Sequence, residues 1–131
     1  MLFRSIDRAG AGDPGGSLLV TSSTSAIHGA PANEAYAASK TAVLGLIRGL
    51  AVEYARYGIR ANAILPGWIT TDMTAPLQGW DKFEEKVIGR VPMRRWGDRQ
   101  DFAGIAVYLA SDASRFHTGD SMVIDGGYTI F

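Results

Sequence analysis

Tyr36-Ala37-Ala38-Ser39-Lys40 is the stretch from which the rest of the chain can be interpreted. On a helix, residues four apart share a face, so the Tyr36 phenol and the Lys40 ammonium group are predicted to point the same way. An ammonium group beside a phenol favours the phenolate, and such a tyrosine can exchange a proton near neutral pH. This spacing is also common on solvated helix faces, so its meaning depends on the segments around it.

Further segments accompany this pair in a fixed order. Upstream, an apolar run at residues 18–20 leads into a Ser/Thr cluster at residues 21–25. Downstream, the chain contains Asn62-Ala63-Ile64-Leu65-Pro66-Gly67, then Thr71-Asp72 and, near its end, Val123-Ile124-Asp125-Gly126-Gly127. Together with Tyr36 and Lys40, this series closely resembles the C-terminal half of the short-chain dehydrogenase/reductase family, over about residues 15–128.

The resemblance implies the α/β fold class, as the C-terminal part of a Rossmann-like doubly wound parallel sheet. About three strands with flanking helices are expected, in one domain over residues 1–131. The residue patterns predict strands at 17–22, 59–65 and 121–124, helices at 36–57 and 99–110, and a short helix at 81–88 within an irregular connection. This alternation is typical of right-handed crossovers onto a parallel sheet. Gly58 and Asp98 are expected to cap the two longer helices.

The resemblance also points to a catalytic serine. In the family this serine stands thirteen residues before the tyrosine, a position that Ser23 holds in this chain. Ser22, Thr24 and Ser25 are rival hydroxyls that the spacing alone excludes, and a strand-end hydroxyl can also serve the nearby backbone.

The catalytic roles implied by the resemblance fall to Ser23, Tyr36 and Lys40. Tyr36 would exchange a proton with the substrate oxygen, Ser23 would hold that oxygen, and Lys40 would tune the tyrosine and bond the nicotinamide ribose. No metal site is expected. The implied contacts to the cofactor, NAD or NADP, are Tyr36, Lys40, Pro66, Gly67, Ile69 and Thr71.

The first half of the family's fold is not expected in this chain. Family members begin with a strand, a glycine-rich turn and a helix that receive the dinucleotide pyrophosphate. Gly10 and Gly12 follow no apolar strand and precede no helix, so they do not meet the requirements of that turn. The expectation is therefore a partial domain that lacks the N-terminal glycine-rich dinucleotide-binding half.

Composition limits the remaining possibilities. Of 131 residues, 47% are hydrophobic and 20% charged, and 13 basic residues balance 13 acidic ones, which does not favour a nucleic-acid partner. The absence of cysteine excludes disulfides and thiolate metal sites and fits a cytoplasmic location. No apolar run approaches the roughly 18 residues of a membrane-spanning helix, so no membrane partner is expected.

The helix that carries Tyr36 has two stripes. Its apolar residues at helical spacing are Val43, Leu46, Ile47, Leu50, Ala51 and Tyr54, and its small residues are Ala38, Ala42, Gly45 and Gly49. The small stripe packs either against the chain's own sheet or against a second subunit. The resemblance favours the second subunit, and hence a homo-oligomer.

Three other features leave alternatives open. His28 either lines a substrate pocket or, as the simpler interpretation, is solvated. Trp68, Trp80 and Phe83 lie where the family has its substrate lid, and they either shape an apolar pocket or anchor a loop. A further group, Arg90, Arg94, Arg95 and Arg99 with Asp98 and Asp101, favours a solvated face over an anion site.

Three functions compete. The first is an NAD(P)-dependent oxidoreductase that interconverts a small-molecule secondary alcohol and a carbonyl, nearest in appearance to 3-oxoacyl reductases and polyol dehydrogenases. The alternative is a catalytically inactive truncated remnant that acts only through self-association or by binding a full-length relative. A serine hydrolase using Ser23 and His28 is the third, but the chain has no Gly-x-Ser-x-Gly elbow.

Overall fold

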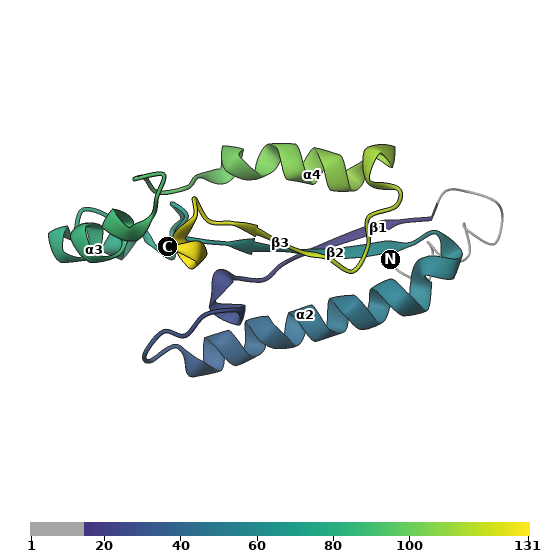
Figure 1. Ribbon diagram of the computed structural model, residues 1–131, viewed down its shortest axis with the longest axis horizontal. Helices are drawn as coiled ribbons and strands as arrows, with labels where there is room; N and C mark the ends of the chain where they lie inside the picture. Colours follow the sequence, from purple (N-terminus) through teal and green to yellow (C-terminus); the bar gives the residue numbers. More distant parts are fainter. Residues whose placement is uncertain (1–14) are drawn as a thin grey trace.

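A computed structural model describes residues 15–131 and contains a parallel sheet flanked by helices. The expectation for Gly10 and Gly12 therefore lies outside the described residues. The longer elements are β1 (Ser17–Thr21), α2 (Glu34–Tyr54), β2 (Arg60–Pro66), α3 (Asp81–Lys86), α4 (Ala103–Ala110) and β3 (Ser121–Ile124). The sheet lies between α2 and α4 (Figure 1), so the predicted α/β fold is confirmed.

The three strands pair in the order β1-β2-β3, all parallel. Ser17 pairs with Arg60 and Ala63 with Ser121, which aligns the carboxyl ends of β1 and β2 at one edge of the sheet. The start of α2 and all of α3 lie at that edge (Figure 1). In open parallel sheets this edge is where ligands bind.

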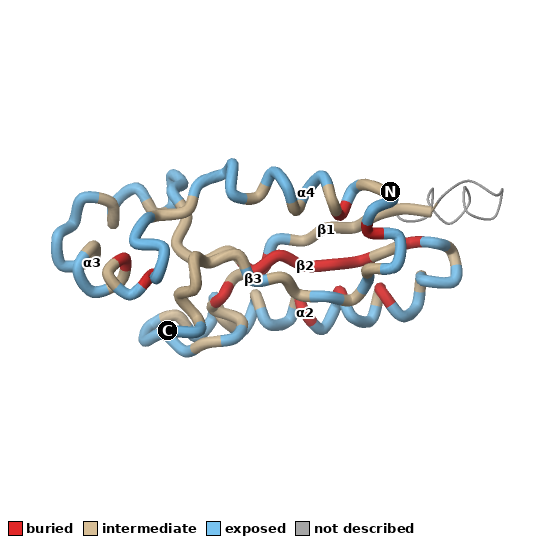
Figure 2. Tube along the Cα trace, turned by 45° about the horizontal axis from the view of Figure 1, so that its top comes forward, coloured by how far each residue is buried: buried red, intermediate tan, exposed pale blue. Residues whose placement is uncertain are grey.

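The core lies between β2 and the inner face of α2. Leu44, Ile47 and Ala51 of the helix pack with Ala63 and Leu65 of the strand. Figure 2 shows β2 buried along most of its length, while α2 alternates between buried and exposed positions. Helical periodicity predicted Ile47 and Ala51 on this face, because side chains three and four residues apart share it, but it did not include Leu44.

Two details of α2 differ from the prediction. Leu46, assigned to the apolar stripe, is 60% exposed, because at helical spacing it lies on the side of the helix away from Leu44, Ile47 and Ala51. The helix begins at Glu34, and after Tyr54 the chain continues as a short 3-10 turn. Gly58 ends that turn with φ of 67°, the left-handed conformation expected at that position.

The small-residue stripe of α2 faces away from the sheet. Ala38, Ala42, Gly45 and Gly49 are all exposed, and a Cβ atom added at either glycine would meet nothing within 4 Å. Within the described part of the chain, packing against its own sheet does not explain this stripe.

One expectation about the connections is wrong. The chain moves from β1 to β2 and from β2 to β3 in the same direction across the sheet, yet α2 and α4 cover opposite faces (Figure 1). Two such crossovers have opposite hands, so they cannot both be right-handed. The handedness preference applies to short strand-helix-strand units, whereas the connection between β2 and β3 includes α3, several 3-10 turns and α4.

The start of α4 shows the predicted cap. The Asp98 side chain accepts a hydrogen bond from the backbone N–H of Gln100, and Asp101 accepts one from the N–H of Asp98. A 3-10 turn, Arg99–Phe102, separates this capping box from α4. Among residues 15–131, no helix is both long enough and apolar enough to cross a membrane.

Candidate active site

A cavity of about 440 Å³ opens at the carboxyl edge of the sheet, beside the first turns of α2. It is of the size that holds small molecules. One group of lining residues follows β1 and continues into α2, and the other follows β2. All seven predicted site residues line it: Ser23, Tyr36, Lys40, Pro66, Gly67, Ile69 and Thr71.

Ser23, the serine that the family spacing selects, lies in the wall of the cavity. Its Oγ atom accepts a hydrogen bond from the Ser25 N–H at 3.1 Å, which leaves its own proton free for another acceptor. The Ser22 hydroxyl donates to the Lys40 carbonyl at 2.8 Å, and Ser22 is buried. Thr24 is also buried. These contacts distinguish Ser23 from Ser22 and Thr24, whereas Ser25 also lines the cavity and its Oγ atom likewise accepts one hydrogen bond, from Asn33.

Tyr36 and Lys40 stand one turn apart near the start of α2, as the sequence predicted. Tyr36 is 38% exposed, so a ligand in the cavity can reach it. The Lys40 Nζ atom lies 5.6 Å from the centre of the Tyr36 ring and donates to the Thr21 carbonyl at 3.2 Å. That bond fixes the ammonium group between the end of β1 and the phenol.

The turn after β2 forms the opposite side of the cavity. The Thr70 N–H donates to the Gly97 carbonyl and the Gly97 N–H to the Trp68 carbonyl, which holds this turn in an extended bridge. Ile69, between those two contacts, donates its own N–H to no acceptor within residues 15–131. A backbone donor is therefore left available beside the cavity.

Gly67 has a packing role in the same turn. A Cβ atom added to it would lie 2.6 Å from the Asp125 Cβ atom, so a larger residue would push the two segments apart. Burial raises the pKa of Asp125, but hydrogen bonds from Thr129 and the Gly127 N–H outweigh it and leave that pKa lowered. The Asp125-Gly126-Gly127 segment thus packs directly against the turn at Gly67.

His28 also lines the cavity, which corrects the simpler expectation of a solvated histidine. It is half-buried, and its ring packs edge-on against Tyr128 with ring centres 5.7 Å apart. Its Nδ1 atom lies 3.1 Å from the Gly29 carbonyl oxygen. From the sequence only its place in the loop could be predicted, because nothing local to His28 signals the contact with the distant Tyr128.

An aromatic cluster stands behind the cavity. Trp68 packs edge-on against Phe83, Trp96 and Tyr128, with ring centres between 5.0 and 6.3 Å apart. The Trp96 indole N–H donates to Glu84 at 2.8 Å. Trp68 lines the cavity, so this part of the predicted lid shapes the pocket and also anchors the long connection.

A second cavity, of about 760 Å³, lies on the other side of Trp68 and Ile69. Its charged groups include Arg95 and Asp101, which form an ion pair at 2.7 Å. Hydrogen bonds from Arg95 and from the Asp98 N–H lower the pKa of Asp101 to about 2. The paired charges agree with the predicted solvated face. We therefore consider the smaller cavity as the candidate active site, because it is the one that Ser23, Tyr36 and Lys40 line.

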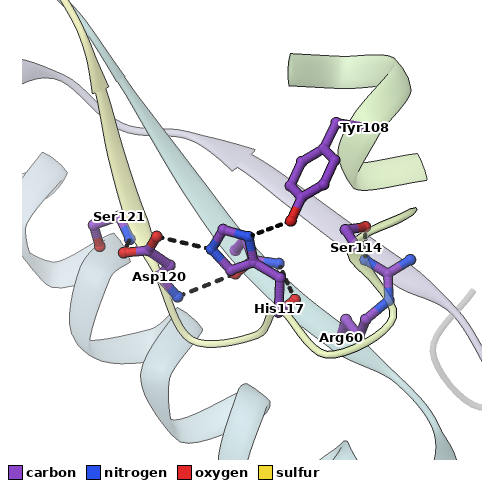
Figure 3. A network of polar contacts seen from close by, with 7 residues as sticks. Arg60, Tyr108, Ser114, His117, Asp120 and Ser121 are labelled. Carbon is purple, nitrogen blue, oxygen red and sulfur yellow. Dashed lines mark hydrogen bonds and ion pairs between the residues drawn. The ribbon is translucent and has the colours of Figure 1, made fainter. Parts of the chain in front are cut away.

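A separate polar network joins α4 to the start of β3 (Figure 3). The His117 ring lies between the Tyr108 hydroxyl, 3.1 Å from Nδ1, and the Asp120 carboxylate, 2.8 Å from Nε2. The Asn62 side chain donates to the His117 carbonyl and accepts from the Asp120 N–H. None of these residues lines the candidate active site, so this network joins elements of the fold rather than serving the cavity.

Comparisons with known proteins support the same interpretation. The family model described as Enoyl-(Acyl carrier protein) reductase matches residues 3–129. A 2-dehydro-3-deoxy-D-gluconate 5-dehydrogenase from Pseudoalteromonas atlantica is 38% identical over 98% of this chain and 50% of its own length. A 5-keto-D-gluconate 5-reductase from Escherichia coli is 45% identical over 72% of this chain and 37% of its own length.

Solved structures agree with these relatives. A gluconate 5-dehydrogenase from Burkholderia cenocepacia, in complex with NADP and tartrate, superposes with a TM-score of 0.90 at 33% identity, over 98% of this chain and 49% of that one. A 4-hydroxyisoleucine dehydrogenase complexed with NADH superposes with a TM-score of 0.89 at 32% identity, over 97% of this chain and 52% of that one. The chain thus spans about half the length of the relatives it matches.

Proposed function

The chain belongs to the short-chain dehydrogenase/reductase family, and on that premise we propose that it carries the chemistry of an NAD(P)-dependent oxidoreductase. The reaction is the interconversion of a secondary alcohol and a carbonyl. The observation that carries the proposal is the cavity in which Ser23, Tyr36 and Lys40 meet the turn after β2. The printed names of the relatives describe dehydrogenases and reductases, which supports the same class of reaction.

NAD or NADP is the proposed cofactor, and the residues present fit a nicotinamide. The Ile69 N–H, which has no acceptor among residues 15–131, is a group that a carboxamide can bond, and the Thr71 hydroxyl, which contacts Thr74, lies beside it. Lys40 offers an ammonium donor suited to ribose hydroxyls. Pro66 and Gly67 complete that wall. When bound, the nicotinamide ring supplies the site that accepts or gives the hydride.

Tyr36 is the proposed acid/base. In alcohol oxidation its phenolate takes the proton of the substrate hydroxyl, and in carbonyl reduction its phenol returns that proton to the oxygen. The Lys40 ammonium group stabilises the phenolate from the same helix face. Ser23 donates its free hydroxyl proton to the substrate oxygen and so holds it within reach of Tyr36.

Self-association is a further part of the proposal. The outward face of α2 presents Ala42, Gly45, Gly49 and Val52, and it is exposed along its length. Small side chains allow another helix to approach closely. We propose that a second copy of the chain covers this face.

The proposed function is tested by nucleotide-dependent turnover. The protein is assayed with NAD⁺ and NADP⁺ against secondary alcohols, and the Tyr36→Phe variant is compared with the unchanged protein. Loss of turnover in Tyr36→Phe with an intact fold supports the assignment, because this substitution removes one hydroxyl group. Equal turnover in the two proteins removes it.

A further inference from the structure

The two sides of the candidate active site differ in chemistry. The side from residues 21–40 offers hydroxyl, amide, imidazole and ammonium groups, and the side from residues 66–77 is mostly apolar. The polar side includes Ser23, Ser25, His28, Asn33, Tyr36 and Lys40, and the apolar side includes Trp68, Ile69, Met73 and Leu77. A ligand between the two sides meets hydrogen-bonding groups on one side and mostly apolar side chains on the other.

The polar side has more hydrogen-bonding capacity than the reacting oxygen requires. Ser23 and Tyr36 suffice to hold one substrate oxygen. Ser25 and Asn33 are engaged with each other, since the Asn33 Nδ2 atom donates to the Ser25 Oγ atom at 3.1 Å. That contact leaves the Ser25 proton and the Asn33 side-chain oxygen over. His28 adds a ring nitrogen, Nε2, that has no partner among residues 15–131.

The contact of His28 with Gly29 indicates what that nitrogen can do. A carbonyl oxygen only accepts hydrogen bonds, so the contact at 3.1 Å requires a proton on Nδ1. In the neutral ring Nε2 is then an acceptor. The edge-on contact with Tyr128, at an angle of 68°, holds the ring against the wall of the cavity.

We propose that His28 is a specificity-determining residue: it accepts a hydrogen bond from a second substrate hydroxyl, so the site takes polyhydroxylated secondary alcohols. This inference rests on the proposed oxidoreductase function. The carbon skeleton of the substrate lies against Trp68, and its hydroxyls face the polar side. A simple alcohol that displaces water from the cavity leaves the His28 Nε2 atom without a hydrogen-bond partner. The loss of that bond disfavours binding of the simple alcohol.

The test compares two alcohols that differ by one hydroxyl, cyclohexanol and trans vicinal cyclohexanediol, each with NAD⁺ and NADP⁺. The variants are His28→Phe, which keeps an aromatic ring against Tyr128 but has no acceptor, and His28→Gln, which keeps an acceptor. We expect the unchanged protein to prefer the diol in kcat/KM. His28→Phe should reduce that preference by about tenfold, mainly through KM, and His28→Gln should retain most of it.

The outcomes separate the two proposals. Turnover with the same diol preference in His28→Phe as in the unchanged protein overturns the role of His28 and leaves the oxidoreductase function standing. The role is also overturned if the unchanged protein prefers the matching hydroxycyclohexane carboxylate over the diol, because the recognised group is then an anion. Absence of nucleotide-dependent turnover for every alcohol contradicts the function and the inference together. Thermal unfolding of both variants confirms that they fold.

Discussion

Lys40 makes two contacts, and we expect the Lys40→Met substitution to have two separate effects. Its Nζ atom bonds the Thr21 carbonyl and lies 5.6 Å from the Tyr36 ring centre. We expect Lys40→Met to change the pH dependence of kcat, since the charge beside the phenol is lost, and to weaken nucleotide binding, since a donor is lost. Lys40→Arg should recover only part of both, because a guanidinium group keeps the charge without the compact shape.

The measurement is a pH–rate profile together with nucleotide affinity by calorimetry. Lys82→Met is the matched control, because Lys82 is exposed in α3 and lies outside the cavity. If Lys40→Met keeps the profile and affinity of the Lys82→Met control, Lys40 has no part in the chemistry.

Local spacing was enough to predict that Tyr36 and Lys40 lie together in one cavity. Tyr36 and Lys40 share a face because they are one helical turn apart. The choice of Ser23 over Ser22 came from the family's spacing, and its physical reason, the bond from Ser22 to the Lys40 carbonyl, is a contact between residues 18 positions apart. The placement of His28 likewise depends on Tyr128, which helical or strand periodicity cannot relate to it.

Among the elements, the attachment of α4 to β3 gives a prediction about pH. The hydrogen bond from His117, followed by that from the Ser121 N–H, lowers the pKa of Asp120 in the folded chain. Because the pKa of Asp120 is lower in the folded chain than in the unfolded chain, its carboxylate stabilises the fold at pH values above the unfolded pKa of about 3.9. This stabilisation is lost as the pH falls through the pKa of the folded chain. Asp120→Asn should therefore reduce stability at neutral pH by up to about 1 kcal/mol, since the carboxylate is partly exposed.

Thermal unfolding between neutral and strongly acidic pH measures this effect. Asp112→Asn is the control, because Asp112 is exposed and lies outside the network. The difference between Asp120→Asn and the unchanged protein should shrink as the pH falls, whereas a difference that is constant with pH would contradict the ionic origin of the contact.

The elements themselves show what sequence patterns can and cannot determine. Strand and helix positions were predicted to within a few residues, because apolar runs and helical periodicity are local signals. The placement of α2 and α4 on opposite faces of the sheet was not predicted, because it depends on the path of the long connection after β2. That path is set by tertiary contacts such as the Trp68 cluster and the bridge between Ile69 and Gly97.

For the whole molecule, the exposed face of α2 predicts association. Gly49→Gln places a long side chain on that face, where an added Cβ atom meets nothing within 4 Å, and it raises helix propensity by up to about 1 kcal/mol. The fold should therefore survive while self-association weakens. Light scattering measures the result, with Arg48→Gln on a different face of the helix as the control.

A monodisperse monomer for the unchanged 131-residue chain would contradict this prediction directly. Equal association in Gly49→Gln and Arg48→Gln would show that another surface holds the copies together. The outer edge of β1, which pairs with no strand within residues 15–131, is the surface that would then require testing.

Tyr36 is the residue that we propose performs the acid/base step of nucleotide-dependent alcohol oxidation. The most direct measurement is kcat for Tyr36→Phe beside Tyr57→Phe, with both folds checked by thermal unfolding. Tyr57 is a matched control because it lies beyond the far end of α2 and lines neither cavity. We predict that Tyr36→Phe loses at least about a hundredfold in kcat, the usual size of a general acid/base contribution, while Tyr57→Phe keeps it. Near-equal kcat values for the two variants would contradict the claim.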